Sequence, residues 1–384
     1  MLKGSFPTGK FAQMRTPFYF YDLKLLRRTL EAIRAAVSAV PEFRVHYAVK
    51  ANANPVILKE ISAAGLGADC VSGGEIRAAL AAGFRPEGIV YAGVGKSDSE
   101  IMLALDSGIS RFNVESAAEL EVIAELAAKA GKKAPVSLRI NPDIGAHTHS
   151  NITTGLAENK FGIIYEQMEE VMRLALSLPS VEYRGLHFHI GSQILDMMDF
   201  VALCNRINSL VDELSKAGLP VGDINVGGGL GVSYEHPNLL PVPDFASYFG
   251  TFRRHLKLPA GTPVHFELGR SVVAQCGSLI SRVLYVKQGT TKQFAVIDGS
   301  MTELIRPALY KAYHRIENLS SDEPEEIYDV VGPVCESSDV FLKAAHLNRC
   351  RRGDYLAIRS AGAYGEAMAS QYNCRPLPES LFGE

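Results

Sequence analysis

Short apolar runs alternate with amphipathic segments from about residue 43 to residue 270, and this alternation is the main structural signal in the chain. Eight runs have the length and the β-branched and aromatic content of strands, at 43–51, 66–72, 88–93, 109–114, 135–141, 183–191, 221–229 and 264–269. Between them, Ser97 and Ser116 each precede a glutamate by three residues, as in a capping box that opens a helix. One apolar helix face is predicted from the spacing of Met168, Val171, Met172 and Ala175.

Eight strands that alternate with helices over about 230 residues predict a parallel (β/α)8 barrel. A doubly wound open sheet stays as the alternative, because alternation alone does not separate the two folds. After residue 271 the pattern changes to short strand-like runs between turns, at 279–286, 293–297, 327–331 and 355–358. These runs predict a second, mostly antiparallel β domain, which the strand-like residues 18–21 are expected to join. The predicted domains are 24–262 for the barrel and 1–23 plus 263–384 for the β domain.

Composition narrows the class of protein. The 384 residues are 47% hydrophobic and 21% charged, with a net charge of −3 and no dense basic stretch, so neither nucleic acid nor an anionic membrane is an expected partner. No apolar signal core and no run of about 18 apolar residues occurs. Six scattered cysteines without a C-x-x-C pair indicate reduced thiols and a cytoplasmic location. A metal is not expected, since neither His147 and His149 nor His187 and His189 have a carboxylate or cysteine cluster beside them.

Chemically reactive side chains gather at the predicted strand ends, where β/α barrels carry their active sites. In chain order these ends hold Lys50, Asp69 with Ser72, Arg139 with Asn141, His189 with Ser192, Gly227–Gly229, and Glu267 with Arg270. A lysine that closes an apolar strand can serve as an amine nucleophile or form a Schiff base. The simpler alternative is a lysine that only extends from the strand end into solvent.

The glycine triplet and the glutamate each have a functional and a structural interpretation. Gly227–Gly229 follow an apolar strand, and their backbone amides could form a concavity for phosphate, although a plain tight turn is the alternative. Glu267 could pair with a cationic ring nitrogen, or it could form a salt bridge with Arg270 or Arg139.

His187 and His189 alternate along a strand, so only one of them is expected to face the barrel mouth. His189 is the candidate, and His187 is expected to be structural. An amine lysine, a phosphate concavity, a ring-stacking histidine and an acidic ring partner together predict a site for pyridoxal 5'-phosphate.

Six motifs make the chain resemble the alanine-racemase-fold class of pyridoxal-phosphate enzymes and, within it, the diaminopimelate decarboxylases. They are H-Y-A-V-K-A-N at 46–52, H-F-H-I-G-S-Q at 187–193, G-G-G-L-G at 227–231, R-P-A-L-Y at 306–310, G-P-V-C-E-S-S-D at 332–339 and A-G-A-Y-G at 361–365. The resemblance covers nearly the whole chain. Two departures stand out, because the family usually has proline in place of Leu268 and often has aspartate in place of Asn225.

The resemblance implies roles for individual residues. Lys50 is expected to bind the cofactor covalently, His189 to stack on its ring and Glu267 to contact the ring nitrogen. The other expected cofactor-binding residues are Asp69, Ser192, Gly227, Gly228, Gly229, Leu268, Gly269, Arg270 and Tyr364. Cys335 is the implied proton donor and reaches the partner's active site in a homodimer, so Lys50, His189 and Cys335 are the predicted catalytic residues. The implied substrate-binding residues are Arg270, Arg306, Tyr310, Glu336 and Tyr364.

The implied activity is decarboxylation of meso-diaminopimelate to L-lysine and carbon dioxide, the last step of lysine biosynthesis. Glu267 favours a decarboxylase, because the related racemases place arginine at this position. Arg306, Tyr310 and Arg270 would hold a distal carboxylate of the substrate, and Glu336 a distal ammonium. The alternatives are a decarboxylase of another diamino acid such as carboxynorspermidine, an amino-acid racemase, and a regulatory or carrier protein without turnover. The polar segment 147–155 is a candidate lid over the substrate.

Overall fold

The computed structural model describes residues 4–142 and 160–384, so the candidate lid at 147–155 lies outside the described residues. The chain divides into two compact units. The barrel unit comprises Leu30–Gly231 and Asp244–Gly269, and the β unit comprises Met1–Thr29, Val232–Pro243 and Arg270–Glu384.

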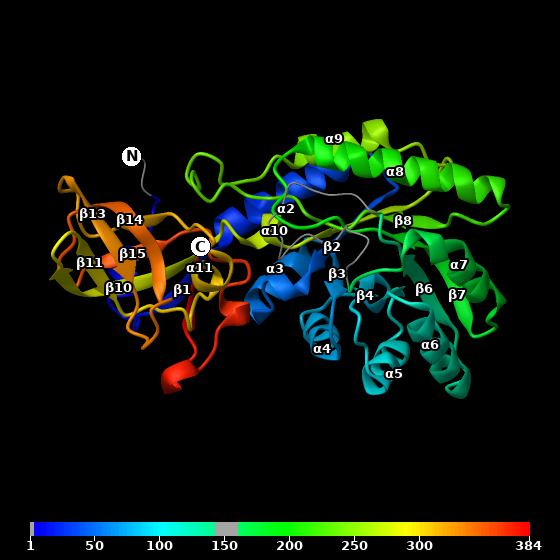
Figure 1. The fold of residues 1–384 in the computed structure, drawn as a ribbon, viewed down its shortest axis with the longest axis horizontal. Coiled ribbons are helices and arrows are strands. Elements are labelled where there is room, and N and C mark those ends of the chain that lie inside the picture. Colours follow the sequence, from blue (N-terminus) through cyan, green and yellow to red (C-terminus); the bar gives the residue numbers. More distant parts are fainter. Residues whose placement is uncertain (1–3, 143–159) are drawn as a thin grey trace. The chain divides into compact units, whose positions relative to one another are not determined.

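Eight parallel strands close into a barrel in chain order, and the first strand pairs with the last (Figure 1). They are β2 (Phe43–Ala48), β3 (Gly67–Cys70), β4 (Ile89–Tyr91), β5 (Arg111–Val114), β6 (Ala134–Arg139), β7 (Val181–His187), β8 (Asp223–Asn225) and β9 (Val264–Leu268). The closed order confirms the predicted parallel barrel and excludes the open doubly wound sheet. All eight predicted strands are present, and each is shorter than predicted. Most end earlier, because the chain leaves the ladder once it reaches the loops that carry polar side chains.

Helices lie on the outside of the barrel strands (Figure 1). They are α3 (Pro55–Ala63), α4 (Gly73–Ala81), α5 (Asp98–Ser107), α6 (Ala117–Lys129), α7 (Met168–Ser177), α8 (Met197–Lys216) and α9 (Phe245–His255), and α2 (Leu23–Val37) crosses the first unit boundary. The predicted capping box of Ser97 with Glu100 is present at α5. Ser116 accepts a hydrogen bond from the backbone N–H of Glu119 at α6. The predicted apolar face of α7 is also confirmed, since all four of its members are buried.

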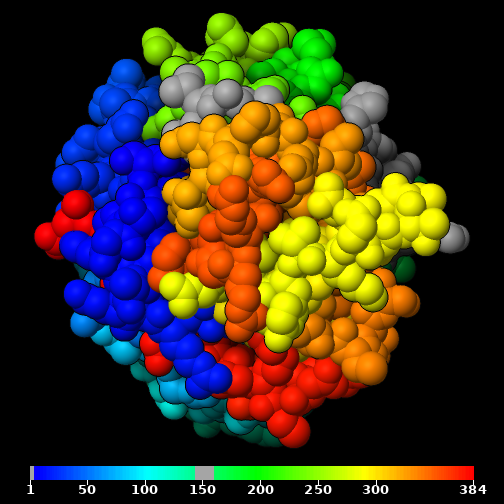
Figure 2. All heavy atoms as spheres, turned by 90° about the vertical axis from the view of Figure 1, so that its left-hand side faces the viewer, coloured from blue at the N-terminus to red at the C-terminus, as the bar shows by residue number. Residues whose placement is uncertain are grey.

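The β unit contains a sheet in the order β12–β15–β10–β11–β13–β14, with β1 paired to β10 and β16. The strands are β1 (Phe18–Asp22), β10 (Gly277–Gln288), β11 (Gln293–Ile297), β12 (Ile316–Asn318), β13 (Glu325–Val331), β14 (Val340–Asn348), β15 (Tyr355–Ile358) and β16 (Glu379–Gly383); short helices α1 (Thr8–Phe11), α10 (Arg270–Val273) and α11 (Arg306–Tyr310) accompany them. Most pairs are antiparallel, as predicted, and β11–β13 and β1–β16 are parallel. In the space-filling view, yellow and orange residues of this unit lie beside red C-terminal residues (Figure 2).

The predicted strand at 18–21 joins the β unit, where Phe18 and Phe20 pack with Phe11 and Ile280 in an aromatic core. The predicted domain boundary at residue 262 differs from the observed units. β9 pairs in register with β2 and β8, so it completes the barrel, and that unit ends at Gly269. Among the described residues, no helix is long and apolar enough to cross a membrane.

Candidate active site

The predicted site residues divide between the two units. Those in the barrel unit are Lys50, Asp69, His189, Ser192, Gly227, Gly228, Gly229, Glu267, Leu268 and Gly269. Those in the β unit are Arg270, Arg306, Tyr310, Cys335, Glu336 and Tyr364. The barrel residues stand at or just beyond the carboxyl ends of β2, β3, β7, β8 and β9, which is where β/α barrels carry their chemistry.

Lys50 and Asp69 are electrostatic neighbours at the ends of adjacent strands. Lys50 lies in the short 3₁₀ turn η1 (Val49–Ala51) that follows β2, and its side chain is exposed. Asp69, in β3, is 2% exposed, and its Oδ1 has no hydrogen-bond partner among the described residues. Burial raises the pKa of Asp69 well above its ordinary value, the charge of Glu267 raises it further, and the ammonium of Lys50 opposes both.

Glu267 is a buried carboxylate held by three neighbouring side chains. Its Oε1 accepts hydrogen bonds from Nδ2 of Asn225 at 2.7 Å and Nδ2 of Asn113 at 3.0 Å. Its Oε2 lies 3.0 Å from Nε2 of His187. Burial alone would raise the pKa of Glu267, but the charge and hydrogen bond of His187 and the other donors outweigh it, so the pKa lies well below its ordinary value. A negative charge is therefore maintained at the end of β9.

His189 is a neutral imidazole in the same cluster. Burial lowers its pKa well below the ordinary value, and the nearby cations Arg139 and Lys50 lower it further. The backbone N–H of Gly228 donates to Nδ1 of His189 at 3.3 Å, which assigns the ring proton to Nε2. The expectation that only one histidine of this strand faces the site is wrong. β7 ends at His187, so the strict alternation of side chains stops before His189, and both histidines are electrostatic neighbours of Glu267.

The glycine triplet is packed tightly against neighbouring strands. A Cβ on Gly227, whose φ is +71°, would lie 2.4 Å from the carbonyl oxygen of Phe188. A Cβ on Gly228 would lie 1.8 Å from the carbonyl oxygen of Glu267. Two of the three amides already donate to side chains, because Gly227 N–H bonds to Oδ1 of Asn225 at 2.9 Å and Gly228 N–H bonds to His189. Close packing thus requires glycine here, and Asn225 ties this loop to Glu267.

Other residues at the strand ends have structural partners. Arg139 pairs with Glu115 through Nη1 at 2.8 Å, and not with Glu267. Ser72 caps α4 by accepting a hydrogen bond from the N–H of Glu75. Leu268 is fully buried and pairs with Tyr47 of β2, so the leucine that replaces the family's proline sits in ordinary strand pairing.

In the β unit, two buried arginines gather around one tyrosine. Nη1 of Arg270 donates to the hydroxyl of Tyr234 at 2.6 Å, and Nη2 of Arg306 donates to the same oxygen at 3.3 Å. The guanidinium of Arg270 lies 5.0 Å from the ring centre of Tyr364, and that of Arg306 lies 5.9 Å from the ring centre of Tyr310. Burial lowers the pKa of Arg306, and the charge of Arg270 lowers it further. Such a concentration of cationic donors suits a carboxylate or phosphate.

Cys335 and Glu336 lie on a fixed surface loop of the β unit. Both side chains are exposed. Asp339 anchors the loop, since its two carboxylate oxygens accept hydrogen bonds from the backbone N–H groups of Val334 at 2.8 Å and Met301 at 2.7 Å. Oε1 of Glu336 accepts a hydrogen bond from the hydroxyl of Tyr372 at 2.8 Å.

Comparison with known proteins identifies the family. Residues 26–274 match the family described as "Pyridoxal-dependent decarboxylase, pyridoxal binding domain". The chain is 64% identical over 378 residues to the diaminopimelate decarboxylase of Bacteroides thetaiotaomicron, which covers 98% of each chain. The chain belongs to the diaminopimelate decarboxylase family. Its cofactor is pyridoxal 5'-phosphate.

More distant relatives give the same family. The diaminopimelate decarboxylase of Zymomonas mobilis is 42% identical over 368 residues, covering 95% of this chain and 87% of the relative. A crystal structure of diaminopimelate decarboxylase from Helicobacter pylori, complexed with L-lysine, has a TM-score of 0.92 and 41% identity and covers 98% of this chain and 94% of that chain. The resemblance, the fold and the cofactor that were expected from the sequence are thereby confirmed.

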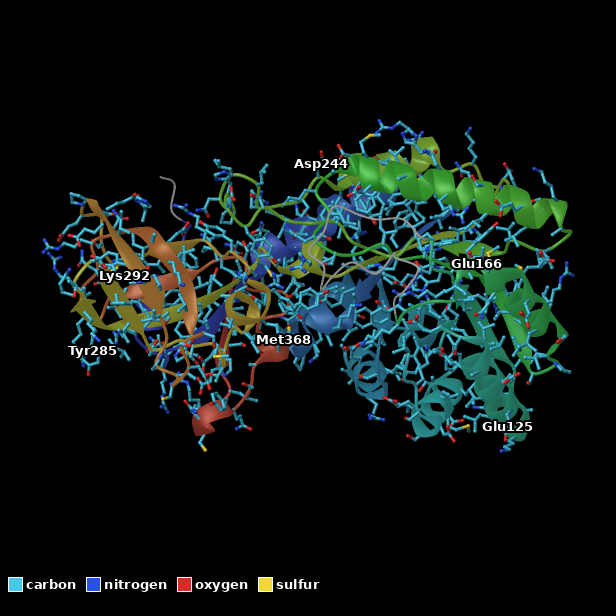
Figure 3. All side chains as sticks on the ribbon, in the orientation of Figure 1. Glu125, Glu166, Asp244, Tyr285, Lys292 and Met368 are labelled. Atoms are coloured by element: carbon cyan, nitrogen blue, oxygen red, sulfur yellow. The ribbon has the colours of Figure 1, made fainter. Side chains whose placement is uncertain are left out.

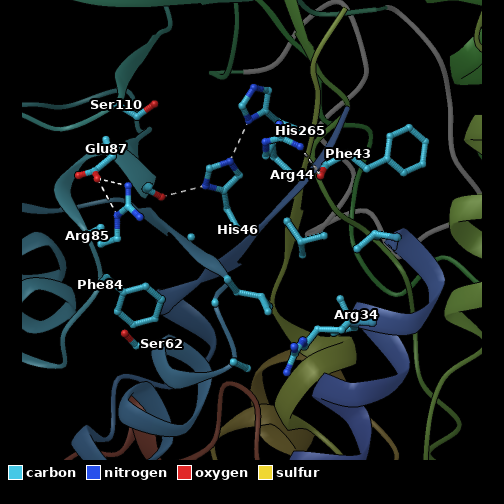
Figure 4. A pocket seen from close by; sticks show the side chains of 18 of the residues that line it. Arg34, Phe43, Arg44, His46, Ser62, Phe84, Arg85, Glu87, Ser110 and His265 are labelled. Carbon is cyan, nitrogen blue, oxygen red and sulfur yellow. Dashed lines mark hydrogen bonds and ion pairs between the residues drawn. The ribbon is translucent and has the colours of Figure 1, made fainter. Parts of the chain in front are cut away.

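The decarboxylase also has a cavity of about 710 Å³ at the opposite, amino-terminal ends of the barrel strands (Figure 4). Within it, Nε2 of His46 lies 2.9 Å from Nδ1 of His265, and Nδ1 of His46 lies 3.0 Å from the carbonyl oxygen of Gly88. Arg85 pairs with Glu87 at the rim. This cavity is therefore separate from the cluster around Glu267, which lies at the carboxyl ends of the strands.

Three residues of these clusters escaped prediction from the sequence, namely Asn113, Tyr234 and His314, whereas His187 was named and expected to be structural. Asn113 and His187 hold Glu267, and Asn113 could have been found, because it belongs to β5 and the ends of the other strands supplied candidates. Tyr234 and His314 gave no comparable signal, since neither belongs to a motif and both reach Arg306 only through the fold of the β unit.

Proposed function

We propose that this enzyme decarboxylates meso-diaminopimelate to L-lysine and carbon dioxide, with pyridoxal 5'-phosphate as cofactor. The relatives that share its full length carry this activity in their name, and the Helicobacter pylori structure holds L-lysine. The observation within this chain that carries the proposal is the buried, ionised carboxylate of Glu267 at the end of a barrel strand. An arginine at this position would favour a racemase, and a carboxylate favours decarboxylation.

The residues of the barrel unit fit the cofactor. A carboxylate offers about four acceptor positions, and three are used by Asn113, Asn225 and His187, so one is left for a protonated ring nitrogen. Lys50 extends an exposed amine beside this cluster, where an aldehyde can reach it. His189 presents a neutral ring suited to stacking.

When it is bound, pyridoxal 5'-phosphate supplies the electron sink for the pair left behind as carbon dioxide departs. Lys50 would hold the cofactor through its amine and release it to the incoming amino acid. Glu267 would keep a proton on the ring nitrogen, since an adjacent negative charge stabilises the cation. Cys335 would then protonate the carbon that has lost its carboxylate. The amino group stays on this carbon in the product.

We further propose a cytoplasmic homodimer with shared active sites. Cys335 and Glu336 are exposed on the β unit and held by Asp339, as expected for side chains that serve a neighbouring subunit. All six cysteines are free thiols, which suits a reducing compartment.

Mixing two inactive variants tests the shared site. Lys50→Ala and Cys335→Ala homodimers should each be inactive, and mixing them after subunit exchange should restore about a quarter of wild-type activity, because half of the dimers then carry one intact site. Sedimentation of each variant checks that it remains a dimer. Failure to recover activity in a mixture shown to contain heterodimers would contradict the sharing of Cys335.

The activity itself is tested with a panel of substrates. Purified protein with cofactor is incubated separately with meso-diaminopimelate, carboxynorspermidine, L-ornithine and L-alanine, and products are separated by chromatography. L-Lysine from the first and no product from the others is the expected result. Turnover of carboxynorspermidine or racemisation of alanine, without lysine formation, would replace the proposed function with the corresponding alternative.

A further inference from the structure

Tyr234 connects the two arginines that are expected to bind the far end of the substrate. Its hydroxyl oxygen receives hydrogen bonds from Arg270 at 2.6 Å and Arg306 at 3.3 Å. We propose that Tyr234 and His314 are positioning residues that hold these two guanidinium groups as a receptor for the distal carboxylate. This inference rests on the proposed function, because it concerns how that reaction selects its substrate.

The bonding at Tyr234 is suited to a third partner. The two guanidinium groups use the lone pairs of the phenol oxygen, so its O–H proton is left to donate. Within residues 4–142 and 160–384, no acceptor for this proton is found. Two cations on one oxygen repel each other, and a carboxylate would relieve that repulsion while accepting the phenol proton. The three groups together therefore match an anion with several acceptor positions.

His314 fixes the orientation of Arg306 from the other side. The imidazole is 1% exposed, and its Nδ1 lies 2.9 Å from the backbone carbonyl oxygen of Arg359. A carbonyl oxygen only accepts, so Nδ1 carries the proton and Nε2 has the lone pair. Nε of Arg306 donates to that lone pair at 3.3 Å. Burial and the charge of Arg306 lower the pKa of His314 to about 3, so the ring stays neutral.

Arg306 is thus anchored by neutral groups and keeps its charge for a ligand. Two of its five N–H donors are used by His314 and Tyr234. In the part of the chain that the structure describes, no acidic side chain pairs with Arg306, although its side chain is buried to 6% exposure. A buried cation held by neutral acceptors alone is an arrangement that an anionic ligand completes.

A purely structural role for Tyr234 is less well supported, because other bonds already fix its segment. The carbonyl oxygen of Ser233 accepts a hydrogen bond from Gln275 at 2.9 Å. Asn238 bonds to Glu317 at 2.7 Å and to Arg359 at 2.8 Å. Removing one oxygen atom from Tyr234 should therefore leave the segment 232–243 in place.

Tyr234→Phe is the direct test, since it removes the oxygen and keeps the ring. We expect the KM for meso-diaminopimelate to rise about tenfold to a hundredfold with kcat changed less than about threefold, because a hydrogen bond to a charged group is lost. Tyr285→Phe is the matched control. Tyr285 is 60% exposed and points into solvent (Figure 3), so its loss of oxygen should change neither constant.

Product binding gives a second readout that does not depend on turnover. L-Lysine retains the distal carboxylate and cadaverine lacks it, so the wild-type enzyme should bind L-lysine more tightly, and Tyr234→Phe should narrow this preference by about tenfold or more. His314→Leu should act in the same direction as Tyr234→Phe. His314→Gln can both donate to the carbonyl and accept from Arg306, so it should largely restore the preference.

Three outcomes would overturn the inference. One is an unchanged KM and ligand preference in Tyr234→Phe. Another is an equal loss of affinity for L-lysine and cadaverine, and a third is a lowered melting temperature with parallel loss of kcat, which would show a structural role. Failure of the proposed function is separate, because it would appear as no lysine formation by the wild-type enzyme while the binding preference could still be measured.

Discussion

The carboxylate cluster of the barrel unit and the arginine cluster of the β unit differ in how their buried charges are compensated. Glu267 is an anion that receives three hydrogen bonds from its own chain and is kept ionised by them. Arg306 is a cation that is held by a phenol and a neutral imidazole, with no acidic partner among the described residues. We propose that the charge of Glu267, which has one acceptor position left, serves the reaction. We propose that the charge of Arg306 binds an incoming anion and thereby selects the substrate.

The largest expected effect is at the amine beside Glu267. Lys50→Ala should lose the near-visible absorbance of the lysine–cofactor linkage, and kcat should fall by roughly 10²–10⁴-fold or more, because no other amine replaces it. Lys59→Ala, an exposed lysine on α3, is the control and should keep both. An unchanged spectrum in Lys50→Ala would show that a different residue binds the cofactor.

Glu267→Gln should change kcat more than KM, which would distinguish the carboxylate cluster from the arginine cluster. The substitution removes the negative charge and turns one acceptor into a donor that faces Asn113 and Asn225 or His187. We expect kcat to fall by about 10²–10³-fold with a smaller change in KM, as for other groups that stabilise charge during the reaction. Steady-state kinetics with saturating cofactor measure both constants. A change confined to KM would contradict a role for Glu267 in the chemical step, and the two clusters would then not differ in function.

Arg306→Met should give the complementary result. The flexible apolar side chain fills similar space and removes the charge, so the distal carboxylate of the substrate loses its partner. KM for meso-diaminopimelate should rise by about a hundredfold, and the preference over L-lysine as a substrate should shrink, because a charged hydrogen bond contributes about 1.5–3 kcal/mol. If kcat alone fell, Arg306 would act in the chemical step instead.

The smallest expected effect is a loss of folding stability in acid. One buried histidine in each unit should contribute a similar decrease in the free energy of unfolding. His46 of the barrel unit and His314 of the β unit are both buried, and burial is the main cause that lowers each pKa to about 3. Below about pH 6.5 each of these histidines binds a proton in the unfolded chain but not in the folded chain. Each should therefore reduce the free energy of unfolding by about 2 kcal/mol between pH 7.5 and pH 5.

Urea unfolding at a series of pH values measures this effect. His46→Gln and His314→Gln should each flatten the loss of stability on acidification, and His236→Gln, an exposed histidine, should not. A pH dependence that is unchanged in both buried variants would contradict the account of these two imidazoles.

The sequence predicted most of the barrel and its cluster for a physical reason. In a parallel barrel the carboxyl ends of all strands meet at one face, so Lys50 after β2 and Glu267 in β9 could be placed together from strand order alone. Fewer strands of the β unit were predicted: β12, β14 and β16 were missed, and β14 has a mixed burial pattern without clear alternation. Tyr234 could not be predicted for a different reason, because it contacts Arg306, which lies 72 residues away in the sequence.

One competition experiment tests most directly whether one cluster serves the chemical step and the other selects the substrate. The enzyme, saturated with cofactor, receives equal concentrations of meso-diaminopimelate and L-lysine, and carbon dioxide, L-lysine and cadaverine are followed over time. We expect one new L-lysine for each carbon dioxide and no cadaverine above background, because meso-diaminopimelate has a carboxylate at each end and L-lysine lacks the distal one. Cadaverine formed at a comparable rate, or carbon dioxide released without L-lysine, would contradict it.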